Sequence, residues 1–191
     1  MNTTTPEKTK TISFDLVTHT SPRANTVEVT VEVEPFNRRK FWTKFPKDSD
    51  NSFVCLYAMQ PVDRADLIKE RAPSAMVPIF SKEMDITKDR FVQIMGFSRS
   101  TMTRKIASKA DLSVDESERL VGLAKLIGQV KTMVKESGNP DGFNPAKWLS
   151  GWMEQPAAAL GGRKPEDLLD TSDGREAVSK LLSQMQSGAY A

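Results

Sequence analysis

The sequence has 191 residues, of which 38% are hydrophobic, and a formal net charge of +2 at pH 7. This length allows one ordinary domain or two small ones with a real core, and the small net charge means that any attraction to nucleic acid must come from local basic patches. The only cysteine, Cys55, excludes an internal disulfide and a cysteine-rich zinc site, and the only histidine, His19, excludes most Ser-His-Asp arrangements.

No apolar run approaches the length of a membrane span, and the first residues, MNTTTPEKTK, lack the apolar core of a signal peptide. The single cysteine fits a reducing compartment. We therefore expect a cytoplasmic protein that does not contact a membrane.

The first of three regions, residues 1–60, is expected to be an N-terminal extension. Valine alternates with Glu and Thr in NTVEVTVEVE (25–34), and TISFDLV (11–17) alternates in the same way, which is typical of half-buried strands. HTSPRAN between them carries turn residues, so a β-hairpin is one prediction. The alternative is a disordered arm that orders only on a partner, because an isolated hairpin is marginally stable in water.

The segment FNRRKFWTKFPK (36–47) interleaves basic and aromatic residues. Such a mixture suits contacts to a nucleic-acid backbone with stacking on bases. We favour a solvated basic face whose aromatic side chains pack on the helical region that follows.

Residues 61–138 have the spacing of helices, and we expect a mainly α fold. One helix is predicted over 87–96, ending at Gly96, and a second begins at Ser98. The longest follows Ser113, which forms a capping box with Glu116.

Two short helices joined by a turn with a glycine describe a helix-turn-helix. The second helix contains basic residues and no acidic residue, and its Met102 and Ile106 are expected to face the core. The alternative is a helical pair whose basic face is solvated and binds no DNA. Arginine reads base edges, whereas Ser, Thr and Lys contact phosphates. The residues predicted to bind operator DNA are Ser98, Arg99, Ser100, Thr101, Thr103, Arg104, Lys105 and Lys109.

The third region, residues 139–191, follows a boundary dense in turn residues. NPAKWLSGWM is predicted to be a helix, and we favour a core position over a partner contact for its Trp148 and Trp152. KPEDLLD predicts a short helix. A last helix is expected to be capped by Asp173 with Glu176 and to end at Gly188.

Gly161-Gly162-Arg163 raises the question of a phosphate-binding loop. The sequence LGGRKPEDLLD fits neither the Walker nor the Rossmann fingerprint, and it follows a helix instead of a strand. We therefore expect left-handed or close-approach glycines between two helices and no cofactor.

The stretch from Phe143 to Ala191 resembles the toxin-binding domain of the Xre/MbcA/ParS-type antitoxins. The resemblance rests on Trp148-Leu149, Ala159-Leu160-Gly161-Gly162, Pro165, Leu168-Leu169-Asp170-Thr171, Gly174 and Gly188. Upstream, GFSRSTMTRKI and DESERLVGLAKL resemble the family's Xre-like helix-turn-helix and the long helix after it. The match covers about 61–191, and the first sixty residues match no family that we can name.

The resemblance implies an antitoxin of a type II toxin–antitoxin pair whose partner is a RES-domain toxin that consumes NAD or uses it for ADP-ribosylation. In such pairs the C-terminal domain covers the toxin's NAD pocket and the last residues reach into its entrance. The toxin-binding residues implied here are Arg163, Lys164, Ser187, Gly188, Ala189, Tyr190 and Ala191. Many relatives have Thr where this chain has Lys164, and because lysine lacks the capping hydroxyl we expect a less stable start of the following helix.

We therefore predict a non-enzymatic, mainly α protein without a metal. An Xre-like helix-turn-helix domain at 61–138 would bind DNA and dimerise, and a toxin-binding domain would occupy 139–191. The partners would be the toxin and operator DNA, through which the chain represses its own operon. The chain itself would form a homodimer or a larger complex with the toxin. The alternatives are a stand-alone transcriptional regulator and a small NAD- or phosphate-binding enzyme.

Overall fold

The computed structural model describes residues 9–16, 25–32, 38–138 and 141–187. The chain divides into two compact units, Met1–Asn37 and Arg38–Ala191. The division lies after Asn37, whereas the sequence pattern predicted that the helical region starts at residue 61.

The N-terminal unit contains strands β1 (Thr9–Leu16) and β2 (Asn25–Glu32), which pair in antiparallel fashion. Ile12 is opposite Val29 and Phe14 is opposite Val27, so the apolar positions of the two alternating patterns are in register. Directly opposite residues share a face of a sheet. The structure therefore contains the hairpin, one of the two alternatives for this segment, although residues 19–24 of the predicted turn HTSPRAN lie outside the described residues.

The residues just after the hairpin correct the predicted extension. Residues 38–58 form helix α1 (Arg38–Lys44), the 3-10 turn η1 (Phe45–Lys47) and helix α2 (Ser49–Ala58). Phe45 is fully buried and stacks on Phe80, with ring centroids 5.2 Å apart. Phe41 and Trp42 are buried beside it, which confirms that these aromatic side chains pack on the helical region and leaves none of the three free to stack on bases.

The predicted helix-turn-helix is confirmed. Helices α3 (Pro61–Lys69) and α4 (Met76–Glu83) precede α5 (Lys88–Ile94) and α6 (Arg99–Ser108). Ser98 caps α6, and the capping box of Ser113 with Glu116 begins α7 (Val114–Ser137). The chain turns between α5 and α6 at Gly96, which has a φ of 62°.

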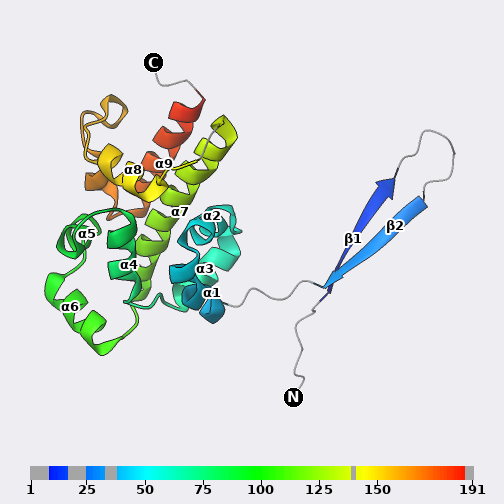
Figure 1. Cartoon of the computed structure of the whole chain (residues 1–191), viewed down its shortest axis with the longest axis horizontal. Helices are drawn as coiled ribbons and strands as arrows, with labels where there is room; N and C mark the ends of the chain where they lie inside the picture. The colour runs from blue at the N-terminus through cyan, green and yellow to red at the C-terminus, as the bar shows by residue number, and fades with distance from the viewer. Residues whose placement is uncertain (1–8, 17–24, 33–37, 139–140, 188–191) are drawn as a thin grey trace. The chain divides into compact units, whose positions relative to one another are not determined.

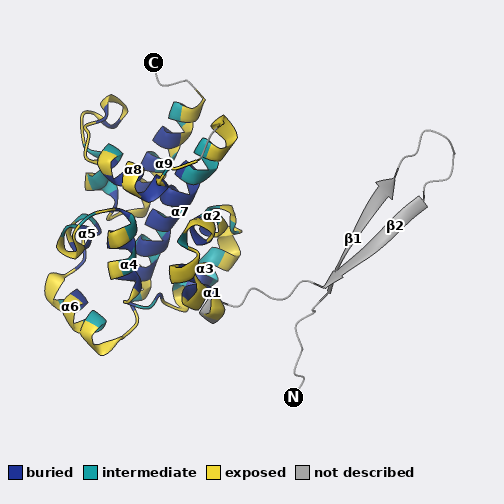
Figure 2. Cartoon of the chain, viewed as in Figure 1, coloured by how far each residue is buried: buried dark blue, intermediate teal, exposed yellow. Residues whose placement is uncertain are grey.

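Helix α7 runs through the middle of the helical unit, with α2 and α3 on one side and α8 and α9 on another (Figure 1). Its middle stretch is buried around most of its circumference (Figure 2). The buried members of this stretch are Leu120, Val121, Leu123, Ala124, Leu126, Ile127, Gly128, Gln129 and Val130. A helix that is apolar on most of its sides lies inside its fold, and α7 is the central element of one continuous core.

The C-terminal region consists of α8 (Pro145–Met153), the 3-10 turns η2 (Ala158–Leu160) and η3 (Pro165–Leu168), and α9 (Ser172–Gln186). The expected cap of α9 is wrong, because the N-cap is Thr171, whose hydroxyl accepts from the backbone N–H of Gly174 at 3.1 Å. Threonine precedes Asp173 by two residues, and either side chain is a common cap. The predicted end at Gly188 lies outside the described residues.

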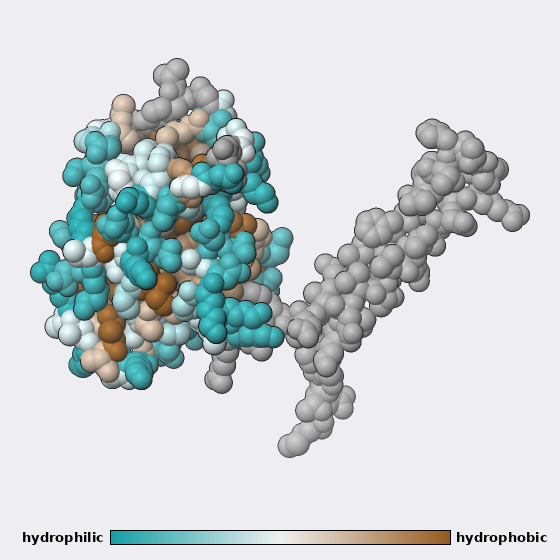
Figure 3. Space-filling model, in the orientation of Figure 1, coloured by the Kyte–Doolittle hydropathy of each residue, from teal (hydrophilic) through white to brown (hydrophobic). Residues whose placement is uncertain are grey.

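The face of the helical unit seen in Figure 3 is largely hydrophilic, with small, separated hydrophobic areas. None of the helices in the described ranges combines the length and apolar character needed to cross a membrane. Among the same residues no group of three or more His, Cys, Asp or Glu side chains could hold a metal ion.

At Gly128 the backbone of α2 lies close against α7. A Cβ at this position would lie 2.1 Å from the carbonyl oxygen of Phe53, a backbone atom that moves only if α2 moves. We expect Gly128→Ala to lower the free energy of unfolding by about 2–3 kcal/mol, as overpacking does in well-filled cores. Urea denaturation followed by circular dichroism measures this loss.

The matched control is Gly151→Ala in α8, where a Cβ would meet nothing within 4 Å. This change should leave the protein as stable as before or stabilise it by up to about 1 kcal/mol, because alanine is the better helix former. A Gly128→Ala protein as stable as the Gly151→Ala protein would contradict the close packing of α2 on α7.

Candidate functional site

The basic helix α6 presents two arginines to solvent. Arg99 and Arg104 are exposed, and neither forms an ion pair with the described residues. The neighbouring hydroxyl groups serve the helix itself: Ser98 accepts from the backbone of Thr101, and Thr103 donates to the carbonyl of Arg99 at 2.9 Å. Ser100 is exposed beside Ser98.

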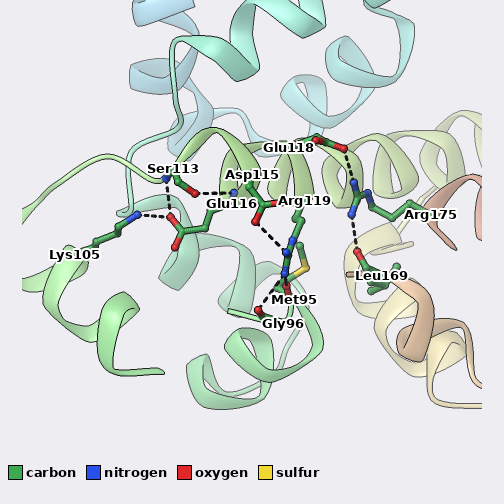
Figure 4. A network of polar contacts seen from close by, with 10 residues as sticks. All are labelled: Met95, Gly96, Lys105, Ser113, Asp115, Glu116, Glu118, Arg119, Leu169 and Arg175. Atoms are coloured by element: carbon green, nitrogen blue, oxygen red, sulfur yellow. Dashed lines mark hydrogen bonds and ion pairs between the residues drawn. The ribbon is translucent and has the colours of Figure 1, made fainter. Parts of the chain in front are cut away.

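Lys105 differs from these arginines because its ammonium group is paired inside the fold. It contacts the Glu116 carboxylate, which also accepts from the backbone N–H of Ser113 at 2.6 Å (Figure 4). Burial raises the pKa of Glu116, but the hydrogen bonds and charge of Lys105 and the bonds from Ser113 outweigh it, so the pKa lies below its ordinary 4.5. Lys105 therefore joins α6 to α7, while Lys109 ends α6 exposed, in a left-handed conformation with a φ of 54°.

Met102 and Ile106 confirm the expected inner face of α6, because Met102 is 1% exposed and Ile106 packs partly buried against the core. The turn before them is held by Arg119 of α7. Its guanidinium group donates to the carbonyls of Met95 and Gly96 at 3.2 and 3.1 Å and pairs with Asp115 (Figure 4). Sequence reasoning missed Arg119, although its spacing of four from Asp115 was visible.

The C-terminal loop closes on its own backbone. Gly161 and Gly162 have φ values of 67° and 78°, and a Cβ at either would meet nothing within 4 Å, so the left-handed geometry and not a close approach explains them. The backbone N–H groups of Gly161, Gly162 and Arg163 donate to the carbonyls of Ala158, Ala157 and Leu160. A phosphate cradle needs free N–H groups, and these three are already used.

Arg163 and Lys164 have different surroundings. Arg163 is exposed, and its Nε donates to the Leu160 carbonyl at 3.1 Å, which fixes the stem of the side chain to the loop. Lys164 is half-buried, lies 3.7 Å from Glu166, and makes no side-chain cap for η3. Glu166 also pairs with Arg90 of α5, so the loop is joined to the helix-turn-helix.

The last predicted contact residues lie at the end of α9. Ser187 is the C-cap of this helix and is exposed. Gly188, Ala189, Tyr190 and Ala191 lie outside the described residues.

Trp148 corrects the expectation that both tryptophans of α8 are core residues. Its side chain is 37% exposed, whereas Trp152 is half-buried. The two indoles stack with centroids 5.9 Å apart and planes 9° apart, and Phe143 lies 6.2 Å beyond Trp148. The apolar spacing predicted which face of α8 packs on the core, but this buried face is narrower than expected, because Leu149 and Met153 already fill it.

Arg175 is a second residue that sequence reasoning missed. It is buried, its Nη1 donates to the carbonyl of Leu169 at 2.8 Å, and its Nη2 pairs with Glu118 of α7 at 2.9 Å (Figure 4). Burial lowers the pKa of this guanidinium group, and the nearby Glu118 acts in the opposite direction. No pattern in the sequence indicates that an arginine on α9 points inward, because its partners come from α7 and from the turn before α9.

A helix-turn-helix with exposed arginines, packed on a small C-terminal helical region with an exposed basic loop, defines a class of binding proteins. Two family models match this chain: the antitoxin Xre-like helix-turn-helix domain over residues 63–125 and the antitoxin Xre/MbcA/ParS C-terminal toxin-binding domain over residues 142–188.

Individual relatives agree with this assignment. The Prs ADP-ribosylating antitoxin of Sphingobium sp. (strain YBL2) is 41% identical over 140 residues, covering 73% of this chain and 88% of that protein. The antitoxin Xre of Photorhabdus laumondii is 24% identical over 122 residues, covering 64% and 77% of the two chains. That of Yersinia enterocolitica is 24% identical over 105 residues, covering 55% and 66%. The chain belongs to the Xre/MbcA/ParS family of antitoxins, which are binding proteins and not enzymes.

Proposed function

We propose that this antitoxin neutralises a RES-domain toxin that consumes NAD or uses it for ADP-ribosylation, by covering the toxin's NAD pocket with residues 139–191. The observation that carries the proposal is the match of residues 142–188 to a toxin-binding domain. The name of the Sphingobium relative, Prs ADP-ribosylating antitoxin, supports a toxin with this chemistry.

The geometry of the C-terminal loop suits steric inhibition. Arg163 is exposed on a loop that its own backbone hydrogen bonds hold in place, so little conformational freedom is lost when it is bound. Its positive charge complements the phosphates of NAD at the mouth of a nucleotide pocket. Helix α9 ends at the exposed Ser187, from which residues 188–191 would enter the pocket.

Removing residues 187–191 should abolish neutralisation and leave the fold intact, because α9 buries its apolar residues Val178, Leu181 and Leu182 before this point. The measurement is growth of cells that co-express the toxin encoded beside this chain, combined with thermal unfolding of the shortened protein. We expect toxicity to return at an unchanged melting temperature. Full rescue of growth by the shortened chain would contradict the proposal that the tail blocks the pocket.

We further propose that α6 binds operator DNA as the recognition helix of a homodimer and represses the chain's own operon. Arg99 and Arg104 are exposed cations of this helix that can reach bases or phosphates, together with Lys109. Lys105 contributes less, because Glu116 offsets its charge.

Replacing Arg99 and Arg104 together with alanine should weaken binding to the DNA upstream of the operon by at least tenfold. It should also reduce the slope of log affinity against log salt by about one for each phosphate that the protein no longer neutralises. Gel shifts at several salt concentrations measure both quantities. The chain that lacks residues 187–191 is the control and should bind DNA as the parent does. The double arginine variant should still rescue growth of cells that express the toxin. Equal DNA affinity and slope in the double variant would remove α6 from the DNA surface.

A further inference from the structure

Three aromatic side chains of the C-terminal region form a continuous row, which we call the aromatic ladder: Phe143, Trp148 and Trp152. Trp148 is its middle member, stacked on Trp152 at 5.9 Å and tilted against Phe143 at 6.2 Å. Its exposed fraction of 37% makes it one of the large hydrophobic side chains that the described surface leaves open to solvent.

Helix α8 packs on the core without the exposed part of the ladder. Ala146, Leu149 and Met153 are each no more than 1% exposed and form the face that the helix presents to the core. Trp148 lies outside that face, with its side chain partly in water, and its indole N–H has no hydrogen-bond acceptor within the described ranges of the chain. The exposed part of the Trp148 ring is apolar surface left in water, and it adds nothing to the core.

The ladder is continuous with the loop that carries Arg163. Trp152 packs against a small cluster of Ala157, Leu160 and Leu181, which supports the turn through Gly161 and Gly162. A row of apolar side chains therefore leads from Phe143 to that turn and remains inside residues 142–188, the span of the toxin-binding domain.

The ladder also has the physical properties of a binding hot spot. Stacking restricts the rotamers of both indoles before a partner arrives, so burying them costs little side-chain entropy. Tryptophan is enriched among the few residues that dominate protein interfaces, where its flat body fills an apolar pocket and its N–H reaches a polar acceptor.

We propose that the aromatic ladder is a docking surface for the toxin, with Trp148 inserted into an apolar groove of the toxin that offers an acceptor for the indole N–H. This inference rests on the proposed function, because it assigns a second contact to the same domain. It differs in its residues and chemistry from the contacts proposed for Arg163 and for residues 187–191, since the ladder supplies affinity and not occlusion of the pocket.

The test is isothermal titration calorimetry of the full chain with the purified toxin that is encoded beside it. Trp148→Ala should weaken the complex by about 30-fold or more, the range of interface hot spots. The matched control is Val62→Ala on α3, which truncates a side chain that is 73% exposed outside the toxin-binding domain. The Val62→Ala chain should bind within twofold of the parent.

Tryptophan fluorescence gives a second measurement that does not depend on a truncated side chain. Of the tryptophans, Trp42 is 6% exposed and Trp152 is half-buried, so we expect Trp148 to dominate quenching by acrylamide. Saturating the chain with the toxin should remove this accessible component, and the Trp148→Phe chain should lack it from the start. A toxin without tryptophan, made by replacing each with phenylalanine, keeps the signal specific to this chain.

The outcomes separate the ladder from the proposed function. If the parent binds the toxin but Trp148→Ala binds equally well, or if acrylamide quenching is unchanged in the complex, the ladder proposal is wrong and the proposed function stands. If the parent binds no toxin, both are overturned. If Trp148→Ala converts a dimer of this chain to a monomer in sedimentation, the ladder contacts a second copy and the proposal is overturned.

Discussion

The burial of α7 is the constraint on which the rest of the helical unit depends. From Leu120 to Val130 this helix is apolar or small except at Lys125, which is half-buried, and at Gln129, whose amide bonds to Ser179 and Ser183 of α9. No single neighbour can cover such a helix, so α2, α3, α8 and α9 must all pack on it. The helix-turn-helix and the C-terminal region therefore share one core instead of forming two separate cores.

Polar contacts position the two candidate binding surfaces on this shared core. Arg119 holds the turn before α6, and Arg175 ties the start of α9 to α7, while Glu166 joins the C-terminal loop to Arg90 of α5. Arg175 is buried, so removing Glu118 would leave its charge poorly solvated. Each arginine that serves the fold is thus distinguished by its partners from Arg99, Arg104 and Arg163, whose charges face solvent.

The sequence predicted what local chemistry controls. A few neighbouring residues determine each of four local features, and each was found where expected: the caps at Ser98 and Ser113, the turn at Gly96 and the left-handed pair Gly161-Gly162. The sequence also predicted that the aromatic side chains of 36–47 pack on the helical region, but it did not predict α2 as part of the core, because Phe53 is recognised as a core residue only through its contact with Phe80, which is distant in the sequence. The exposure of Trp148 and the burial of Arg175 depend in the same way on distant partners.

The claim that both surfaces are held by one core centred on α7 is tested most directly by native-state hydrogen exchange. Buried positions in α5, α7 and α9, such as Phe91, Leu123 and Val178, should exchange with a single free energy of opening equal to that of global unfolding. If the amides of α9 open at a free energy several kcal/mol below those of α5 and α7, the C-terminal region unfolds by itself and the shared core is contradicted.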